Sequence, residues 1–333
     1  MKQSEIRQDY VHNRVVIISP GRSKRPHDFH PTGTPHQVHR AECPFCPEQV
    51  DKVKAVASYK GQKPWSIKVI KNIFPAVRKD NPKAYGDQEV VIETPEHDLE
   101  LSELSVEHIE QLLKVYADRT WAQSKDKKIQ YIMIFKNNGG RAGASIDHAH
   151  SQVFATNFLP PHIVDKLRRA EEYLIRYGTC YYCDLIAKEG KGPRMIENNE
   201  FVFVEAPYAS SYNYEAWILP KRHLDNITNL NKAERLAFAR ALKNILGKLN
   251  SIGLPYNYYL HQVVRYGNEH LYFRVAPRRD VWAGVELGSR LIVNTVPPED
   301  AAAFYRGDDE KKKGKKKSAT KKLSNKRKSA KRK

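Results

Sequence analysis

Residues 137–152 read NNGGRAGASIDHAHSQ, and they follow closely on the apolar run YIMIF of residues 131–135. An apolar strand, a glycine-rich loop and a second strand over residues 148–154 are therefore expected in that order. Side chains alternate between the two faces of a strand, so His148, His150 and Gln152 should share one face. This stretch predicts a rigid β-unit that presents two imidazoles and an amide beside a flexible turn.

The glycine-rich loop has the composition of a phosphate-binding turn. Glycines let the backbone approach a phosphate closely and offer N–H donors, to which Asn137, Gly143 and Ser145 would contribute. A neutral imidazole is a good nucleophile near pH 7, so His150 could attack a phosphorus atom. For an isolated His-x-His, metal ligands or core residues would be the favoured interpretation. The loop, the trailing Gln152 and the upstream cysteines favour a nucleophile.

The chain also contains an internal repeat. Each half carries a Cys-x-x-Cys pair, a histidine 40 to 51 residues later and a further histidine beyond it. In each half a helix-capping residue follows the middle histidine at the same distance, Ser105 after His97 and Asn231 after His223. Two fused copies of one αβ unit explain this pattern.

Two thiolates and two imidazoles at such spacings are typical of a tetrahedral zinc site. The first predicted site is made of Cys43, Cys46, His97 and His148. The second is made of Cys180, Cys183, His223 and His270. Its fourth ligand is the weaker part, because the repeat places Asn268 there, and His261 is an alternative to His270. Reduced, partly buried cysteines without metal are the alternative for both sites.

The secondary structure expected from periodicity is mixed. Helices are predicted over residues 106–123, 161–177 and 232–250. Besides 131–135, strands are predicted over residues 15–18, 89–92, 201–204, 217–219, 258–262 and 272–275. We therefore expect an α+β fold of two tandem αβ units, each with an antiparallel sheet flanked by helices. The expected divisions are a catalytic unit over 1–160, a degenerate unit over 161–307 and a tail over 308–333.

The net charge of +19 belongs mostly to the tail. Residues 311–333 hold fourteen Lys or Arg and no acid, which leaves only +5 for the rest of the chain. The tail has too little apolar surface to fold. A solvated tail is favoured over a nucleic-acid tether. Four cysteines, no apolar N-terminal leader and no long apolar run predict a reduced cytoplasmic protein without membrane contact.

The central motif resembles that of the galactose-1-phosphate uridylyltransferase family, part of the histidine-triad superfamily. The shared pattern is N-x-G-x-x-x-G-x-S followed by H-x-H-x-Q, over residues 137–152. Two further segments agree, SPGRSKRP over residues 19–26 and NIFPA over residues 72–76. The resemblance covers about residues 5 to 307 and leaves the tail out. It implies that the two tandem units are histidine-triad-like.

The resemblance implies a role for each matched residue. His150 matches the nucleophile that becomes uridylylated, and Gln152 matches the amide that contacts the phosphoryl group. The cysteines and histidines of the first site match structural zinc ligands. Nucleotide- and phosphate-binding positions are matched by Arg22, Arg25, Asn72, Asn137, Gly143 and Ser145.

The sequence departs from the uridylyltransferase pattern at two places, and these departures leave more than one function open. Ala149 stands where the uridylyltransferases usually have proline, and residues 284–302 are more similar to the ADP-glucose phosphorylase branch. The first expectation is a ping-pong transferase that moves UMP between hexose 1-phosphates. An ADP-glucose phosphorylase or adenylyltransferase with the same His150 is the second, and a zinc-stabilised nucleic-acid-binding protein is the third. A homodimer is compatible with the resemblance, as is weak nucleic-acid contact through the tail.

Overall fold

A computed structural model describes residues 3–24, 40–61, 65–265 and 269–308 of the chain. Its central feature is a ten-stranded sheet with the order β3-β4-β5-β7-β6-β11-β12-β10-β9-β8. Every pairing in this sheet is antiparallel. The first half contributes β3 (Ala55–Tyr59), β4 (Ile67–Lys71), β5 (Gly86–Ile92), β6 (Tyr131–Asn138) and β7 (His150–Thr156). The second half contributes β8 (Met195–Asn198), β9 (Val202–Glu205), β10 (Ala216–Pro220), β11 (Tyr256–His261) and β12 (Tyr272–Pro277).

The strand order shows the duplication that the repeat predicts. Read from either edge of the sheet to its middle, the two halves use their strands in the same sequence, and they meet where β6 pairs with β11. Phe135 of β6 faces Tyr259 of β11 across this seam. The α+β fold of two antiparallel units flanked by helices is confirmed.

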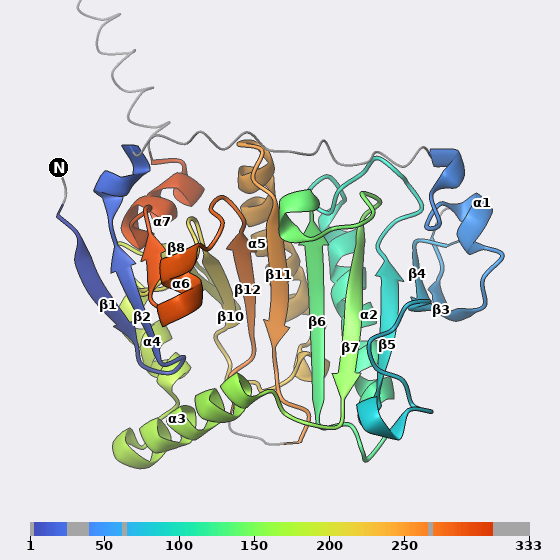
Figure 1. Cartoon of the computed structure of the whole chain (residues 1–333), viewed down its shortest axis with the longest axis horizontal. Helices are drawn as coiled ribbons and strands as arrows, with labels where there is room; N and C mark the ends of the chain where they lie inside the picture. Colours follow the sequence, from blue (N-terminus) through green and yellow to red (C-terminus); the bar gives the residue numbers. More distant parts are fainter. Residues whose placement is uncertain (1–2, 25–39, 62–64, 266–268, 309–333) are drawn as a thin grey trace, which may run out of the picture.

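Two long helices cover one face of the sheet, behind it in Figure 1. They are α2 (Val106–Ser124) and α5 (Lys232–Asn250), and they occupy equivalent places in the two units. The predicted caps are present: the hydroxyl of Ser105 accepts from His108 N, and Asn231 forms a capping box with Glu234. Buried side chains from both helices and from the facing sides of the strands form one continuous core.

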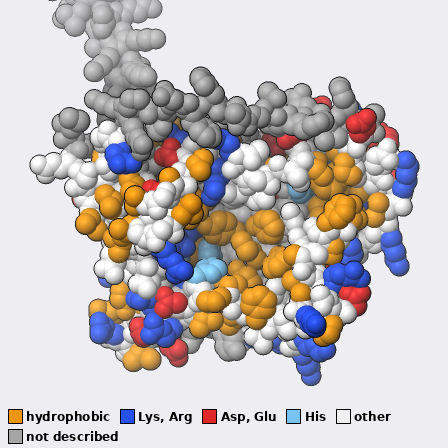
Figure 2. Space-filling view, viewed as in Figure 1, with side chains coloured by type: hydrophobic (Ala, Val, Ile, Leu, Met, Phe, Trp, Pro, Cys, Tyr) orange, Lys and Arg blue, Asp and Glu red, His pale blue; other side chains and the backbone are white. Residues whose placement is uncertain are grey.

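Among the described residues, the elements that cover the opposite face of the sheet lie at its two ends. One end carries η2 (Arg40–Glu42) and α1 (Pro47–Val50), and the other a small sheet of β1 (Glu5–Asp9), β2 (Arg14–Ile18) and β13 (Ile292–Asn294). With this sheet lie α3 (Pro161–Tyr177), α4 (Tyr181–Glu189), α6 (Gly284–Ser289) and α7 (Pro298–Arg306). Figure 2 shows hydrophobic side chains gathered in the hollowed centre of this face. The remaining short helices are η1 (Pro20–Lys24), η3 (Pro82–Ala84), η4 (Gly140–Ala142) and η5 (Ile227–Asn229).

The predicted helices match α2, α3 and α5, and each predicted strand overlaps an observed one. The strand expected over residues 148–154 begins at His150 instead, because its ladder with β5 starts at the pair Ile92 and His150. The division of the chain at residue 160 stays a prediction, as one sheet runs through both halves. The tail from residue 309 on lies outside the described residues. Among the described helices, none is long and apolar enough to cross a bilayer.

Candidate active site and metal centres

His150 begins β7 on the open face of the sheet, the face that α2 and α5 do not cover. Its side chain is 8% exposed, and its ring packs at 4.9 Å from the ring of Phe45. The Nδ1 atom lies 2.9 Å from the backbone oxygen of His148. If Nδ1 carries the proton for this bond, the lone pair is on Nε2. Burial lowers the pKa of His150, and the nearby charge of Lys136 lowers it further, so the ring is neutral at pH 7.

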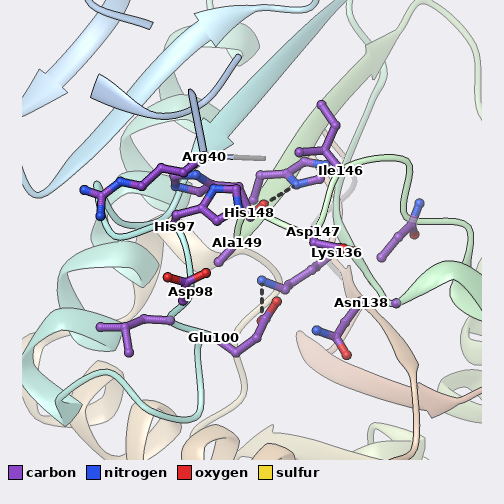
Figure 3. Close-up of a pocket in the computed structure, with 14 residues that line it drawn as sticks. Arg40, His97, Asp98, Glu100, Lys136, Asn138, Ile146, Asp147, His148 and Ala149 are labelled. Carbon is purple, nitrogen blue, oxygen red and sulfur yellow. Dashed lines mark hydrogen bonds and ion pairs between the residues drawn. The ribbon is translucent and has the colours of Figure 1, made fainter. Parts of the chain in front are cut away.

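A cavity of about 510 Å³ reaches His150. It lies between the loop after β5 and the loop that joins β6 to β7, and Figure 3 shows His97 and His148 close together on its wall. Lys136 and Glu100 point toward one another there, at 3.1 Å. The other lining residues are Arg40, Asp98, Leu99, Asn137, Asn138, Gly139, Ile146, Asp147 and Ala149. The cavity joins the expected nucleophile to the loop expected to hold phosphate.

The glycine-rich loop turns through two left-handed residues, Gly139 at φ 81° and Gly143 at φ 84°. A Cβ on Gly139 would lie 3.1 Å from the Cβ of Pro255. The backbone N–H groups of Ala142, Gly143 and Ala144 donate to carbonyls of Gly139 and Gly140. These three amides therefore stabilise the loop itself, whereas Ser145, also expected to bind phosphate, is exposed.

The second unit fixes this loop. Asn257 on β11 donates from Nδ2 to Asn137 Oδ1 and to the carbonyl of Ala142, both at 2.8 Å. Asn137 Nδ2 in turn lies 3.4 Å from the oxygen of Gly143. Sequence reasoning missed Asn257, since only the pairing of β6 with β11 brings it to the loop.

Gln152 lies two residues beyond His150 on the same face. Its Oε1 accepts from Gln88 Nε2 at 2.7 Å and from Asn72 Nδ2 at 3.3 Å. With the oxygen occupied twice, the amide N–H groups of Gln152 remain the donors for a ligand. Sequence reasoning also missed Gln88, which sits on β5 just before the predicted strand begins.

A buried ionic network lies behind this strand, on the helix-covered face. Lys136 Nζ is 2.6 Å from Glu93 Oε2, and both side chains are at most 1% exposed. The carboxylate of Glu93 also accepts from Tyr258, and Tyr116 donates to Ser151, the neighbour of His150. The network supports β7 from the helix-covered side, and its Lys136 also reaches the wall of the cavity.

The structure brings together the four expected ligands of each metal centre. In each set, one ligand atom per residue lies within 4.8 Å of all the others. His148 Nδ1 is 3.6 Å from Cys43 Sγ, and its Nε2 is 2.8 Å from the carbonyl of Thr94, so the ring is oriented from both sides. The first centre stands directly beside the expected nucleophile.

The second centre contains His270, and His261 is not a member of it among the described residues. His270 is the counterpart of His148: its Nε2 lies 2.9 Å from a backbone oxygen, that of Pro220, and the next strand starts two residues later. Tyr272 therefore stands where the first unit has His150. Its hydroxyl is 2.7 Å from His12 Nε2, so the N-terminal hairpin covers this position. Asn268 lies outside the described residues.

Of the remaining predicted binding residues, one contacts the site, one lies away from it and one is outside the described residues. Arg22 is exposed in η1, which follows β2 of the small sheet at the other end of the open face. Arg25 lies outside the described residues. Asn72 reaches the site through Gln152. The described part of the chain thus joins His150, Gln152, Asn72, Asn137 and the loop in one region, with Arg22 in another.

Comparison with known proteins gives consistent relatives. Residues 77–160 match the family model for the N-terminal domain of galactose-1-phosphate uridyl transferase. An ADP-glucose phosphorylase from Arabidopsis thaliana is 32% identical over 331 residues, covering 91% of this chain and 92% of the relative. A galactose-1-phosphate uridylyltransferase from Thermotoga maritima is 28% identical over 326 residues, covering 90% and 96%.

Solved structures agree with the sequence relatives. The crystal structure of an ADP-glucose phosphorylase from Arabidopsis thaliana with bound ADP-glucose has a TM-score of 0.82 at 30% identity, covering 91% of this chain and 99% of that one. A uridylyltransferase structure has a TM-score of 0.71 at 27% identity, covering 93% and 99%. The likeness extends over nearly the whole of each chain.

Proposed function

Because the chain belongs to the galactose-1-phosphate uridylyltransferase family, a family of nucleotidyltransferases, we propose that it moves UMP between hexose 1-phosphates through a covalent nucleotidyl-His150. One observation carries the proposal: the bond from His150 Nδ1 to the carbonyl of His148 presents Nε2 as the nucleophile beside a cavity. The substrates are a nucleotide sugar and a sugar 1-phosphate.

The reaction has two balanced displacements at phosphorus. His150 Nε2 attacks the α-phosphorus of the nucleotide sugar, an N–P bond forms, and the bond to the sugar 1-phosphate breaks. The phosphate of an incoming sugar 1-phosphate then attacks the same phosphorus, and the imidazole leaves. Gln152 and Ser145 supply hydrogen bonds to the phosphoryl oxygens as charge develops on them.

An ADP-glucose phosphorylase is the second candidate for this site. It is favoured by the higher identity and TM-score of the Arabidopsis thaliana relative, 32% and 0.82. The first displacement would then place AMP on His150, and inorganic phosphate would be the acceptor. The two candidates differ in nucleotide and acceptor and share the covalent step.

Zinc fits both sets of four ligands by chemistry, since two thiolates and two imidazoles are its usual structural donors. Zinc at the first centre would hold the His148 segment, whose carbonyl orients His150, and would not touch the substrate. We further propose a cytoplasmic homodimer. The third expectation, nucleic-acid binding, has no supporting contact in the part of the chain that the structure describes.

A donor panel tests the proposal. The purified chain is mixed with UDP-glucose or ADP-glucose labelled at the α-phosphorus, and the protein is assayed for acid-labile, base-stable label. Release of that label by galactose 1-phosphate identifies a uridylyltransferase, and release by inorganic phosphate identifies a phosphorylase. If neither UDP-glucose nor ADP-glucose labels the protein, the covalent step is refuted.

A further inference from the structure

The two Cys-Cys-His-His centres are alike in composition and differ in exposure. Cys43 and Cys46 of the first centre are both 0% exposed. Cys180 and Cys183 of the second are only half-buried, and His223 beside them is exposed. One protein therefore presents the same donor set in a closed and in an open setting.

Apolar packing closes the thiol side of the first centre. Its cysteines belong to a buried cluster that joins α1 to β4 and β5, formed with Phe45, Val50, Trp65, Ile70, Val90 and Ile92. The large cavity beside this centre is lined by His97 and His148 and not by either cysteine. A reagent in that cavity would meet imidazoles, and the sulfur atoms would remain behind them.

The second centre opens into a cavity of its own, of about 280 Å³. Both cysteines and His223 line it, so a molecule in this space lies against three of the four residues of the centre. The rest of the wall comes from the end of α3, the start of α4 and one buried acid, as Ala170, Leu174, Gly178, Thr179, Tyr181, Tyr182 and Glu269. This volume exceeds that of a small thiol reagent or of a peroxide molecule.

We propose that the second centre is an exchangeable metal site and the thiol-modification site of this protein, whereas the first centre is closed. The inference rests on the proposed binding of zinc at both centres. Exchange requires a competing ligand to reach the metal as one protein ligand leaves, so equal donor sets release metal at rates set by access and by local opening. Small chelators and electrophiles reach the ligands of the second centre without unfolding of the chain.

Peroxide is the natural oxidant for such an open pair of thiolates. One thiolate attacks a peroxide oxygen, the O–O bond breaks, and a sulfenic acid and water result after proton uptake. The other thiolate then attacks the sulfenic sulfur, an S–S bond forms, and a second water leaves. Each sulfur loses one electron, the peroxide gains two, and the metal ion is set free. The Sγ atoms of Cys180 and Cys183 lie within 4.8 Å of one another, so this disulfide needs little movement.

Metal release from the native full-length chain is the first test. The zinc-loaded protein is mixed with the chromogenic chelator 4-(2-pyridylazo)resorcinol, and release is followed with time. We expect two phases of one equivalent each, with rates separated by about tenfold or more. The double substitution Cys180→Ser and Cys183→Ser should remove the fast phase and leave the slow one.

Thiol labelling gives a readout that is independent of the metal content. With N-ethylmaleimide or dilute hydrogen peroxide, peptide mass spectrometry should find modification at Cys180 and Cys183 long before Cys43 and Cys46. Ala170→Leu, which narrows the cavity and removes no ligand, should slow both labelling and the fast phase.

Each contrary result has its own meaning. Equal labelling rates at the two pairs, faster labelling of the first pair, or a single phase of release would overturn the inference. Protein purified with no metal would contradict the proposed zinc sites, and the labelling order would still decide which centre is open. Failure of nucleotide labelling would affect only the proposed enzymatic function.

Discussion

The Nδ1 atom of His150 lies 2.9 Å from the backbone oxygen of His148, a residue whose own ring belongs to the first metal centre. The two residues thus link the first Cys-Cys-His-His group to the proposed nucleophile. Anything that holds the His148 ring also fixes the carbonyl group that orients His150. The accessible nitrogen of His150 then depends on a contact made by its neighbour.

Replacing the proposed nucleophile should abolish the covalent step. We expect His150→Gly to lower nucleotide labelling and turnover by about a thousandfold or more, because the variant lacks the imidazole proposed to form the N–P bond. The thermal unfolding midpoint should stay close to that of the wild type. Residual labelling of the variant at another histidine would show that the nucleophile is misassigned.

The contact between Gln88 and Gln152 should affect rate more than substrate affinity. Gln88→Ala removes the 2.7 Å bond that orients the amide of Gln152, and we expect kcat to fall about three- to tenfold with little change in KM. Asn72→Ala, which removes the longer 3.3 Å bond, should have a smaller effect on kcat. Steady-state kinetics of the two variants and of Gln152→Ala provide the comparison. An unchanged kcat in Gln88→Ala beside a reduced one in Gln152→Ala would contradict this role.

The buried pair of Lys136 and Glu93 should be a large determinant of stability. Lys136→Met leaves the carboxylate of Glu93 buried without its cation, and we expect a loss of about 3–5 kcal/mol in the free energy of unfolding. Arg78→Met is the matched control, since its pair with Asp80 is exposed and should contribute little. Urea denaturation measures the free energy of unfolding of both variants. Equal losses would show that burial does not make the Lys136–Glu93 pair more important than an exposed pair.

Glu205 should make stability fall with rising pH. Its carboxylate is 1% exposed and has no hydrogen-bond partner among the described residues. Burial raises its pKa to about 8, against the opposing effect of Arg194 and with help from Glu189 and Asp9. The unfolded chain releases this proton near pH 4.5, so the wild type should lose stability between that pH and about 8.

Glu205→Gln removes this titration. The variant and the wild type should be about equally stable at pH 4, and the variant should be more stable at pH 8 by about 1–3 kcal/mol. Urea denaturation across this pH range measures the difference. A constant gap between the two proteins would show that Glu205 is ionised in the folded state.

Loss of the first metal centre should reduce activity, whereas loss of the second should affect it much less. Cys43→Ser removes a ligand beside His148, and we expect His150 labelling to slow about 10- to 100-fold. Cys183→Ser is the matched control, because its centre stands beside Tyr272 and not beside a nucleophile. Labelling rates and zinc content of the two variants test the difference, and equal slowing would contradict the coupling through His148.

Local signals in the sequence predicted the parts of the fold that depend on neighbours in the chain. Ser105 and Asn231 mark their helices correctly, because a cap acts within one turn. The edge strands β3 and β8 were not expected, since a short strand at an edge is defined by its partner. Pairing across the sheet likewise explains why Gln88 and Asn257 were missed.

The internal repeat predicted both Cys-Cys-His-His groups, but it matched the wrong residue of the second half to His148. Sequence spacing put Asn268 opposite His148, whereas the structure puts His270 there, since the Nε2 atoms of His270 and His148 both lie against a backbone oxygen. Only the starts of β7 and β12 reveal that Tyr272 occupies the place of His150. The spacing of residues alone cannot decide which residues of two repeats are equivalent when the repeats differ in length.

The pairing of β6 with β11 joins the two units into one sheet, so neither unit is complete without the other. If the polypeptide were cut between its halves, the catalytic fragment would expose an unpaired strand edge at Asn138 and lose the Asn257 clamp on its turn. The second half carries Tyr272 at the place of His150 and still supplies the pairing strand and Asn257. Because the two units share one sheet, each supplies strand pairing and support that the other lacks when it stands alone.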